Sequence, residues 1–385
     1  MFRLSNTANA AESSLTRQLF NRALKIGDDV VNLTLGDPDV KPNEEIRKAA
    51  CDAIMAGKTR YSQNAGLLDT RKAYAGFFKK QYGIDINPET EVIATVGGMG
   101  ALYLTLTATV NPDDEVIILG PYYVNYKQMI NMNSGKPIVI DRLRRPDDDV
   151  LKDIKKSITD KTVAIVINTP CNPAGDILSP YFLDGLSKIA VENDLLVVTD
   201  EVYNSLVFDE KEASSIVTRP GMKERTIVID SCSKRFCMTG YRIGFAVGPE
   251  EYISAMTRMQ ENIYSCAPLP SQYAAIKAYS GDFDNSNVKQ TYEHRRNILV
   301  SYLEKIEKLS FIYPEATFYC MVDISKTGLK SEEFCYKLLD EAHVAVVPAK
   351  AYGDMYDDYI RIAFTLNDDK LKLACERLTK FMEQF

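Results

Sequence analysis

Short apolar runs rich in β-branched residues recur along the middle of the chain, each bounded by polar or turn residues. The apolar positions within a run are continuous rather than alternating, which is typical of strands buried on both faces. Helical patterns lie between most of these runs, for example over 100–110 and 181–193. This rhythm predicts a mostly parallel sheet covered by helices. The expected strands are the seven segments 91–97, 115–120, 137–140, 162–168, 195–200, 226–231 and 242–248.

The pattern changes in the last hundred residues. A long helix is expected over 292–309, because a helix there has an apolar face made by Leu299, Tyr302, Leu303, Ile306 and Leu309. The remaining elements expected are a strand, a helix, two strands and a final helix, over 317–324, 331–342, 344–348, 359–365 and the C-terminus. This order predicts a smaller α+β domain.

The start of the chain carries a helical pattern over 14–27, which we expect to pack against the smaller domain. We therefore predict a large α/β domain over 45–285, and a small α+β domain made of 1–44 together with 286–385.

Composition excludes several classes of protein. A net charge of −7 disfavours nucleic acid as the main partner, since a phosphate backbone requires clustered Lys and Arg. No apolar run has the length of a membrane span or of a signal peptide. The eight cysteines include no C-x-x-C pair and there are two histidines, so we expect neither a disulfide framework nor a metal site. Reduced thiols in the cytoplasm are the simplest interpretation.

Residues that can bind a ligand follow several expected strands, at the edge where open α/β sheets place their ligands. "GGMGAL" (97–102) leads from a strand into a helix. Its backbone N–H groups could bind phosphate, although the glycines taken alone favour a tight strand-to-helix turn over a binding site. Tyr122, Tyr123 and Tyr126 follow the next strand. We expect at least two of these rings to pack in the core.

Three further strand ends carry polar residues. Asn172 lies in the proline-rich loop "NTPCNPAG", where its amide can meet a bound hydroxyl or carboxylate. Asp200 ends an apolar strand, so its carboxylate is expected to be buried and to need a cationic partner, which a protonated heteroaromatic nitrogen would provide. Lys234 follows Ser231 and Ser233. Alone it could be a solvated lysine, but with these neighbours it indicates pyridoxal 5′-phosphate held by lysine as a Schiff base.

These segments resemble the class I/II aminotransferases of fold type I, which depend on pyridoxal phosphate, and most closely the aspartate and aromatic aminotransferase subgroup. The resemblance covers nearly the whole chain. Its most specific parts are the order N-P-x-G, D-x-x-Y and S-x-S-K-x7-R, in "NTPCNPAG" (168–175), "DEVY" (200–203) and "SCSKRFCMTGYRIG" (231–244). It implies the fold of that family, with a mostly parallel seven-stranded sheet in the large domain.

The resemblance assigns Lys234 as the catalytic residue, which carries the cofactor and then moves the proton between the substrate Cα and the cofactor C4′. Asp200 resembles the partner of the pyridinium nitrogen, and Tyr123 the ring that stacks on the cofactor. Asn172 and Tyr203 resemble the residues that bond its 3′ oxygen. The phosphate is expected to meet Gly98, Met99, Ser231, Ser233 and Arg242.

The family pattern also implies substrate and subunit contacts. The substrate α-carboxylate is expected to meet Arg361, Asn172 and the backbone of Gly36, although a surface arginine on an edge strand also fits Arg361. Tyr61 resembles a tyrosine that reaches the phosphate of the neighbouring subunit, which implies a homodimer with shared active sites. Met99 stands where the family carries a polar or basic residue, so only its backbone is expected to bind.

The expected activity is transfer of an amino group from an L-amino acid to a 2-oxo acid in a ping-pong cycle. A pyridoxal-phosphate-dependent carbon–sulfur β-lyase remains an alternative on the same fold, and a regulatory protein without catalysis is a third hypothesis. Lys41 could meet a distal carboxylate and Lys350 could alter selectivity, or both could be solvated. Cys171, Cys232 and Cys237 are expected to be small packing residues.

Overall fold

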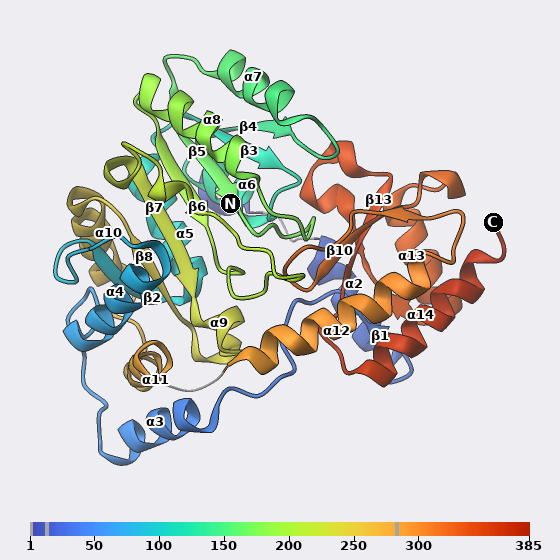
Figure 1. Cartoon of the computed structure of the whole chain (residues 1–385), viewed down its shortest axis with the longest axis horizontal. Coiled ribbons are helices and arrows are strands. Elements are labelled where there is room, and N and C mark those ends of the chain that lie inside the picture. Colours follow the sequence, from blue (N-terminus) through green and yellow to red (C-terminus); the bar gives the residue numbers. More distant parts are fainter. Residues whose placement is uncertain (1–2, 12–14, 282–284) are drawn as a thin grey trace.

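The computed structural model describes residues 3–11, 15–281 and 285–385, with a larger body on the left of Figure 1 and a smaller one, in orange and red, on the right. Within the described residues, seven strands form one sheet in the larger body, in the order β2-β8-β7-β6-β5-β3-β4. Only β8 runs antiparallel to its neighbours. The strands are β2 (Val92–Val96), β3 (Glu115–Gly120), β4 (Lys136–Asp141), β5 (Thr162–Asn168), β6 (Leu196–Asp200), β7 (Thr226–Ser231) and β8 (Ile243–Val247).

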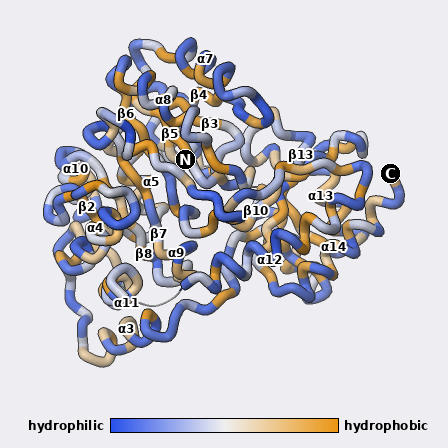
Figure 2. Tube along the Cα trace, viewed as in Figure 1, coloured by the Kyte–Doolittle hydropathy of each residue, from blue (hydrophilic) through white to orange (hydrophobic). Residues whose placement is uncertain are grey.

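Both faces of this sheet are covered, which explains the continuous apolar runs. Neighbouring residues of one strand belong to different cores. Val116 and Ile118 pack with α5 (Gly97–Thr109) and α10 (Glu250–Ile263), whereas Ile117 packs with α7 (Asp147–Ser157) and α8 (Pro180–Glu192). Figure 2 shows these strands as hydrophobic segments within the molecule. The expected mostly parallel sheet is confirmed. The helices of this body are α3 (Glu44–Met55), α4 (Leu68–Tyr82), α5 (Gly97–Thr109), α6 (Asn125–Met132), α7 (Asp147–Ser157), α8 (Pro180–Glu192), α9 (Cys232–Arg235), α10 (Glu250–Ile263) and α11 (Leu269–Ser280).

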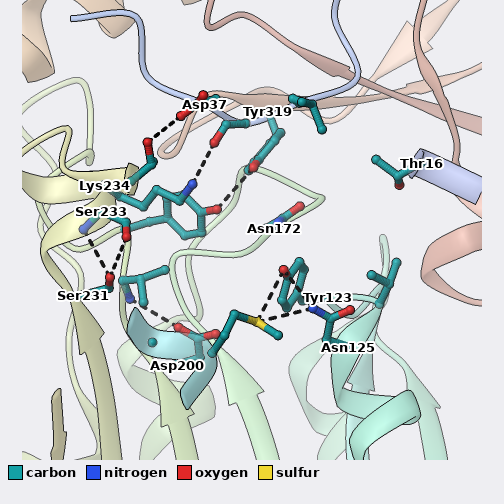
Figure 3. Close-up of a pocket in the computed structure, with 18 of the residues that line it drawn as sticks. Thr16, Asp37, Tyr123, Asn125, Asn172, Asp200, Ser231, Ser233, Lys234 and Tyr319 are labelled. Atoms are coloured by element: carbon teal, nitrogen blue, oxygen red, sulfur yellow. Dashed lines mark hydrogen bonds between the residues drawn. The ribbon is translucent and has the colours of Figure 1, made fainter. Parts of the chain in front are cut away.

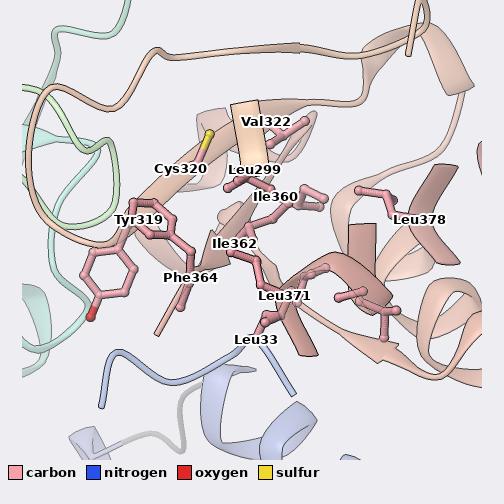
Figure 4. Close-up of a cluster of buried hydrophobic side chains, with 14 of the residues drawn as sticks. Leu33, Leu299, Tyr319, Cys320, Val322, Ile360, Ile362, Phe364, Leu371 and Leu378 are labelled. Atoms are coloured by element: carbon pink, nitrogen blue, oxygen red, sulfur yellow. The ribbon is translucent and has the colours of Figure 1, made fainter. Parts of the chain in front are cut away.

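The smaller body packs helices against an antiparallel sheet in which β10 pairs with both β9 and β13. Its core includes Leu33, Leu299, Ile362, Phe364 and Leu371 (Figure 4). The elements are α12 (Ser286–Leu303), β9 (Ser310–Phe311), β10 (Tyr319–Asp323), α13 (Ser331–Ala342), β11 (Val344–Ala345), β12 (Val347–Pro348), β13 (Tyr359–Ala363) and α14 (Asp368–Met382).

The N-terminal segment joins both bodies. Helix α2 (Leu15–Ile26) packs on β11 and β12, and β1 (Val31–Asn32) pairs in parallel with β11. The short α1 (Asn6–Ala10) lies instead against α6 of the larger body. The contacts of α2 and β1 agree with a small domain that includes the N-terminal segment, whereas the contact of α1 does not, and the division at 45 and 285 stays a prediction.

Two sequence predictions need correction. The helix expected over 292–309 ends at Leu303, where Ile306 N–H and Leu309 N–H bond to the carbonyls three residues earlier and turn the chain. Ile306 and Leu309 are nevertheless buried in the same core. The strand expected over 344–348 is divided at Val346, because β11 pairs with β1 whereas β12 pairs with β13.

In the described part of the chain, no helix combines the length and the apolar character needed to cross a membrane.

Candidate active site

One cavity of about 650 Å³ opens at the edge of the large sheet where the expected ligand-binding residues converge (Figure 3). Val96, the last residue of β2, pairs with Ile243 of β8, and Ser231, the last residue of β7, pairs with Gly244 of β8. The ends of β2 and β7 therefore lie at the same edge of the sheet as the start of β8. All but one of the residues predicted from the sequence line this cavity: Gly36, Gly98, Met99, Tyr123, Asn172, Asp200, Tyr203, Ser231, Ser233, Lys234, Arg242 and Arg361.

One end of the cavity is built to receive an anion. Helix α5 begins there, so its first N–H groups face the cavity with the positive end of the helix dipole. The hydroxyls of Ser231 and Ser233 lie 2.9 Å apart beside it. The guanidinium of Arg242 lies so close to Gly97 that a Cβ on this glycine would be 2.7 Å from Nη2. Glycine also suits the φ of +67° at this position.

Asp200 is a buried carboxylate at the end of β6, and no ion pair to it is found among the described residues. It accepts hydrogen bonds from the Tyr126 hydroxyl at 2.7 Å and from the N–H of Val202 at 3.4 Å. Burial raises the pKa of Asp200 to about 6, although the Tyr126 hydrogen bond acts in the opposite direction. A cation placed against this side chain would favour its ionised form.

Lys234 projects from α9 into the cavity, where its Nζ donates to the Gly36 carbonyl at 2.7 Å. The amine lies 5.5 Å from the centre of the Phe318 ring. Burial lowers the pKa of Lys234 to about 8; Asp37 opposes the shift, and Arg242 and Arg361 add to it. At pH 7 about a tenth of such amines are neutral, roughly three hundred times the fraction expected at the ordinary pKa of 10.5.

Arg361 of β13 is 4% exposed. Its Nη1 donates to Asn172 Oδ1 at 3.0 Å and its Nη2 to the Thr34 carbonyl. The guanidinium also lies 4.3 Å from the centre of the Tyr319 ring. Its Nε has no hydrogen-bond partner within the described part of the chain. A buried cation with an unsatisfied donor is a site for a carboxylate, since an unmade hydrogen bond is costly.

The remaining predictions have different outcomes. Tyr122 and Tyr126 are core residues as expected, whereas Tyr123 lines the cavity. Tyr61 is 85% exposed and does not line its own chain's cavity. Lys41 and Lys350 are also absent from the described lining, and Lys350 lies 3.8 Å from Asp357.

The three motif cysteines behave as packing residues. Cys171, Cys232 and Cys237 are buried, and burial raises the pKa of each thiol. A raised pKa disfavours the reactive thiolate.

Sequence reasoning missed several lining residues and one side-chain role. Asn125 Nδ2 donates to the Tyr123 hydroxyl at 3.1 Å and lies 3.3 Å from Met99 Sδ, so the Met99 side chain contributes as well as its backbone. The Tyr319 hydroxyl lies 3.2 Å from that of Tyr203. A Cβ on Gly36 would lie 1.6 Å from the Tyr319 hydroxyl oxygen, so only glycine fits at position 36. Other lining residues missed are Thr16, Arg17, Thr34, Asp37, Asn168, Thr239 and Tyr352. Asn168 and Thr239 lie within motifs quoted above, whose other residues were assigned, whereas the remaining residues come from segments distant in the sequence.

The family profile described as aminotransferase class I and II matches residues 28–378 of this chain. The chain belongs to the class I and II aminotransferase family. An aromatic-amino-acid aminotransferase 2 of Thermococcus litoralis is 35% identical over 385 residues, which cover 99% of this chain and 98% of that protein. An aspartate aminotransferase of Bacillus subtilis is 33% identical, with 99% of each chain covered.

The fold agrees with this family. An aspartate aminotransferase from Thermus thermophilus, solved with maleate, superposes with a TM-score of 0.92 at 32% identity. The match covers 99% of this chain and 100% of that structure. The seven-stranded sheet lies within the residues 28–378 that the family profile matches, whereas Thr16 and Arg17 of the cavity precede them.

Replacing Asp200 by Asn is expected to stabilise the ligand-free protein at pH 7.5 by about 2 kcal/mol. The folded pKa of about 6 lies above the unfolded value, so ionisation of Asp200 costs stability as the pH rises from about 4 through 6. Asn removes this cost and can still accept from Tyr126. The gain should largely vanish at pH 3, where the carboxyl is mostly protonated in both the folded and the unfolded state. Urea unfolding at the two pH values measures both effects.

Glu201→Gln is the matched control on the adjacent residue. Glu201 is also buried, but it accepts from Tyr82, Thr199, Asn204 and Ser215. An amide there cannot accept all four bonds, so this variant should be less stable than the parent protein. A destabilised Asp200→Asn at pH 7.5 would contradict the account of Asp200.

Proposed function

We propose that this protein binds pyridoxal 5′-phosphate in the cavity and moves the amino group of an L-amino acid to a 2-oxo acid. The observation that carries the proposal is a set of charged groups around one cavity that form no ion pair with the residues the structure describes: an acid at Asp200, an amine at Lys234 and a guanidinium at Arg361. Charged groups that are shielded from water and form no ion pair favour a ligand that supplies the opposite charge. Membership of a family that generally depends on this cofactor supports the same assignment.

The residues present suit each part of the cofactor. Its phosphate fits the anion-binding end, at Gly98, Met99, Ser231, Ser233 and Arg242. Its ring nitrogen fits Asp200, whose charged form a protonated pyridine would stabilise. Tyr123 offers a ring face, and Asn172 and Tyr203 offer donors to the ring oxygen. When bound, the cofactor supplies an electron sink for the bonds at the amino acid Cα.

Lys234 is the proposed acid–base residue. Its lowered pKa leaves a useful neutral fraction near pH 7, so Nζ can take the proton from the Cα of the amino acid. The same nitrogen returns a proton to Cα in the half-reaction that uses the 2-oxo acid. The Gly36 carbonyl, which accepts from Nζ, orients the amine within the cavity.

The α-carboxylate of either substrate is proposed to bind Arg361, beside Asn172 and the N–H of Gly36. The side chain of the substrate then points away from the Ser231 end, towards Thr16 and Asn125 at the other side of the view in Figure 3. Arg17 also lines the cavity, beside Thr16. Because Lys41 does not line the cavity, Arg17 is our candidate for binding the distal carboxylate of a substrate such as glutamate.

The β-lyase alternative has no specific support. The relatives described above are named as an aromatic-amino-acid aminotransferase and as aspartate aminotransferases. The two activities differ in one requirement, since transamination needs a 2-oxo acid whereas β-elimination proceeds without it.

The first test is the visible spectrum of the purified protein during addition of single amino acids. We expect a band of bound pyridoxal phosphate that bleaches with an amino donor and returns with 2-oxoglutarate. Lys234→Ala should abolish both the parent band and turnover. Release of pyruvate and ammonia without any oxo acid would instead support the lyase. Normal turnover by Lys234→Ala would contradict the mechanism.

Two arginine variants should separate the substrate carboxylates. Arg361→Lys should raise KM for every amino acid and 2-oxo acid by about tenfold or more, because the planar two-point contact is lost. Arg17→Ala should raise KM only for dicarboxylic substrates and leave that for aromatic ones within about twofold. Steady-state kinetics with both classes measure the split. An equal effect of Arg17→Ala on the two classes would remove it from the site.

We also propose a homodimer with shared active sites and a cytoplasmic location. Tyr61 is exposed on its own chain, as are the apolar side chains of Ile54 and Met55 in the same segment. A second copy of the chain covering this segment would bury them and bring Tyr61 to a neighbouring cavity. All eight cysteines are free, in keeping with a reducing compartment.

Mixing two inactive variants tests the shared site. Tyr61→Ala and Lys234→Ala should each have little activity, and subunit exchange should restore up to about a quarter of the parent activity. The restored activity arises because half of the sites in each mixed dimer carry neither substitution. Mixed dimers that form, as seen by tagged co-purification, but stay inactive would contradict the role of Tyr61.

A further inference from the structure

Residues 33–39 cross the cavity as a strap between β1 and α3. Four successive carbonyls of the strap accept hydrogen bonds from different elements. Leu33 accepts from the N–H of Ala363, Thr34 from Arg361, Leu35 from the Thr365 hydroxyl and Gly36 from Lys234. The strap thus contacts both the proposed carboxylate-binding arginine and the proposed catalytic lysine.

The strap is fastened on both sides. Towards the smaller body, Asp39 forms a two-point ion pair with the buried Arg295, at 2.7 and 3.0 Å. Towards the larger body, Asp37 Oδ1 accepts from the hydroxyl of Thr239 at 2.7 Å, and Figure 3 shows Asp37 above Lys234. The Asp37 contact therefore joins the strap to the loop that follows α9.

Thr239 has a second contact on the other side of that loop. Its carbonyl accepts from Nη1 of Arg242 at 2.9 Å. The backbone of Arg242 has a φ of 52°, in the left-handed region, which costs energy for a residue other than glycine. The hydrogen bond from its side chain to the Thr239 carbonyl helps to hold this conformation. A chain of hydrogen bonds consequently runs from Asp37 through Thr239 to Arg242.

Asp37 also contributes charge beside Lys234. The charged and titratable groups around this amine are Asp37 on the strap, Asp200 on β6, Cys237 after α9, Arg242 before β8 and Arg361 on β13. The two guanidinium groups disfavour a second cation, and Asp37 is the strongest opposing charge.

We propose that Asp37 and Thr239 are positioning residues: their hydrogen bond holds the strap carbonyl of Gly36 against Lys234 and holds Arg242 at the anion-binding end of the cavity. The inference rests on the proposed cofactor. The bond has a charged acceptor, which makes it stronger than a neutral one, but water competes with it because Asp37 is exposed. We therefore expect a moderate effect on cofactor binding rather than loss of the fold.

Thr239→Val tests the hydrogen bond and keeps the charge of Asp37. We expect the dissociation constant of pyridoxal phosphate, measured by absorbance or fluorescence after its removal, to rise about fivefold. Thr239→Ser restores the hydroxyl and should return the constant to within about twofold of the parent value.

Thr159→Val is the matched control. Thr159 is an exposed threonine whose hydroxyl donates to Glu115 at 2.6 Å, at the opposite edge of the large sheet. Loss of this bond removes the same kind of contact far from the cavity, so cofactor binding should not change.

Asp37→Asn tests the charge and keeps an acceptor for Thr239. The rate at which the ligand-free protein takes up pyridoxal phosphate depends on the neutral amine of Lys234, so its pH midpoint follows the pKa of about 8. Removal of the Asp37 charge should move this midpoint to lower pH, whereas Thr239→Val should leave it in place.

The outcomes are distinguishable. A parent protein that takes up no pyridoxal phosphate would overturn the proposed function together with this inference. A parent that binds it while Thr239→Val binds equally well would overturn the inference alone. Failure of Thr239→Ser to restore binding would also overturn it, because the hydroxyl would then not be the group that acts.

Discussion

The candidate site depends on charged groups at one sheet edge that form no ion pair within the part of the chain that the structure describes. Asp200 is buried with a phenol and a backbone N–H as its donors, and Arg361 is buried with one N–H unsatisfied. Such groups weaken the ligand-free protein, since each costs desolvation energy that no ion pair returns. A ligand with a phosphate, a cationic ring nitrogen and a carboxylate would match these groups, which explains why stability is given up at this edge.

The packing around the cavity provides the rigidity that such a site requires. Strands β6 and β7 are buried on both faces, so Asp200 and the start of α9 are held by core residues rather than by solvent-exposed loops. Asn168 adds a local support, because its side chain accepts from the N–H of Asn172 and donates to the Asp200 carbonyl. The carboxylate, the loop amide and the lysine therefore keep fixed relative positions.

The strap contacts residues of both bodies at the candidate active site. Arg361 belongs to the smaller body and Lys234 to the larger one, yet both donate to strap carbonyls two residues apart. The strap requires glycine at position 36, because a Cβ there would clash with the rings of Tyr319 and Phe318. Any relative movement of the two bodies would change both contacts, so the strap couples the proposed substrate-binding arginine to the proposed catalytic lysine.

The sequence by itself predicted the sheet, the order of its strands along the chain and, through the family resemblance, many of the residues that line the cavity. It could do so because continuous apolar runs mark doubly buried strands, and because motifs such as S-x-S-K follow those strands directly. The tertiary structure alone decided the partners of these residues. Tyr126 meets Asp200 from 74 positions away, and Asp37 meets Thr239 from 202. Contacts of that separation depend on how helices and bodies pack, and no local pattern of hydrophobic and polar residues encodes them.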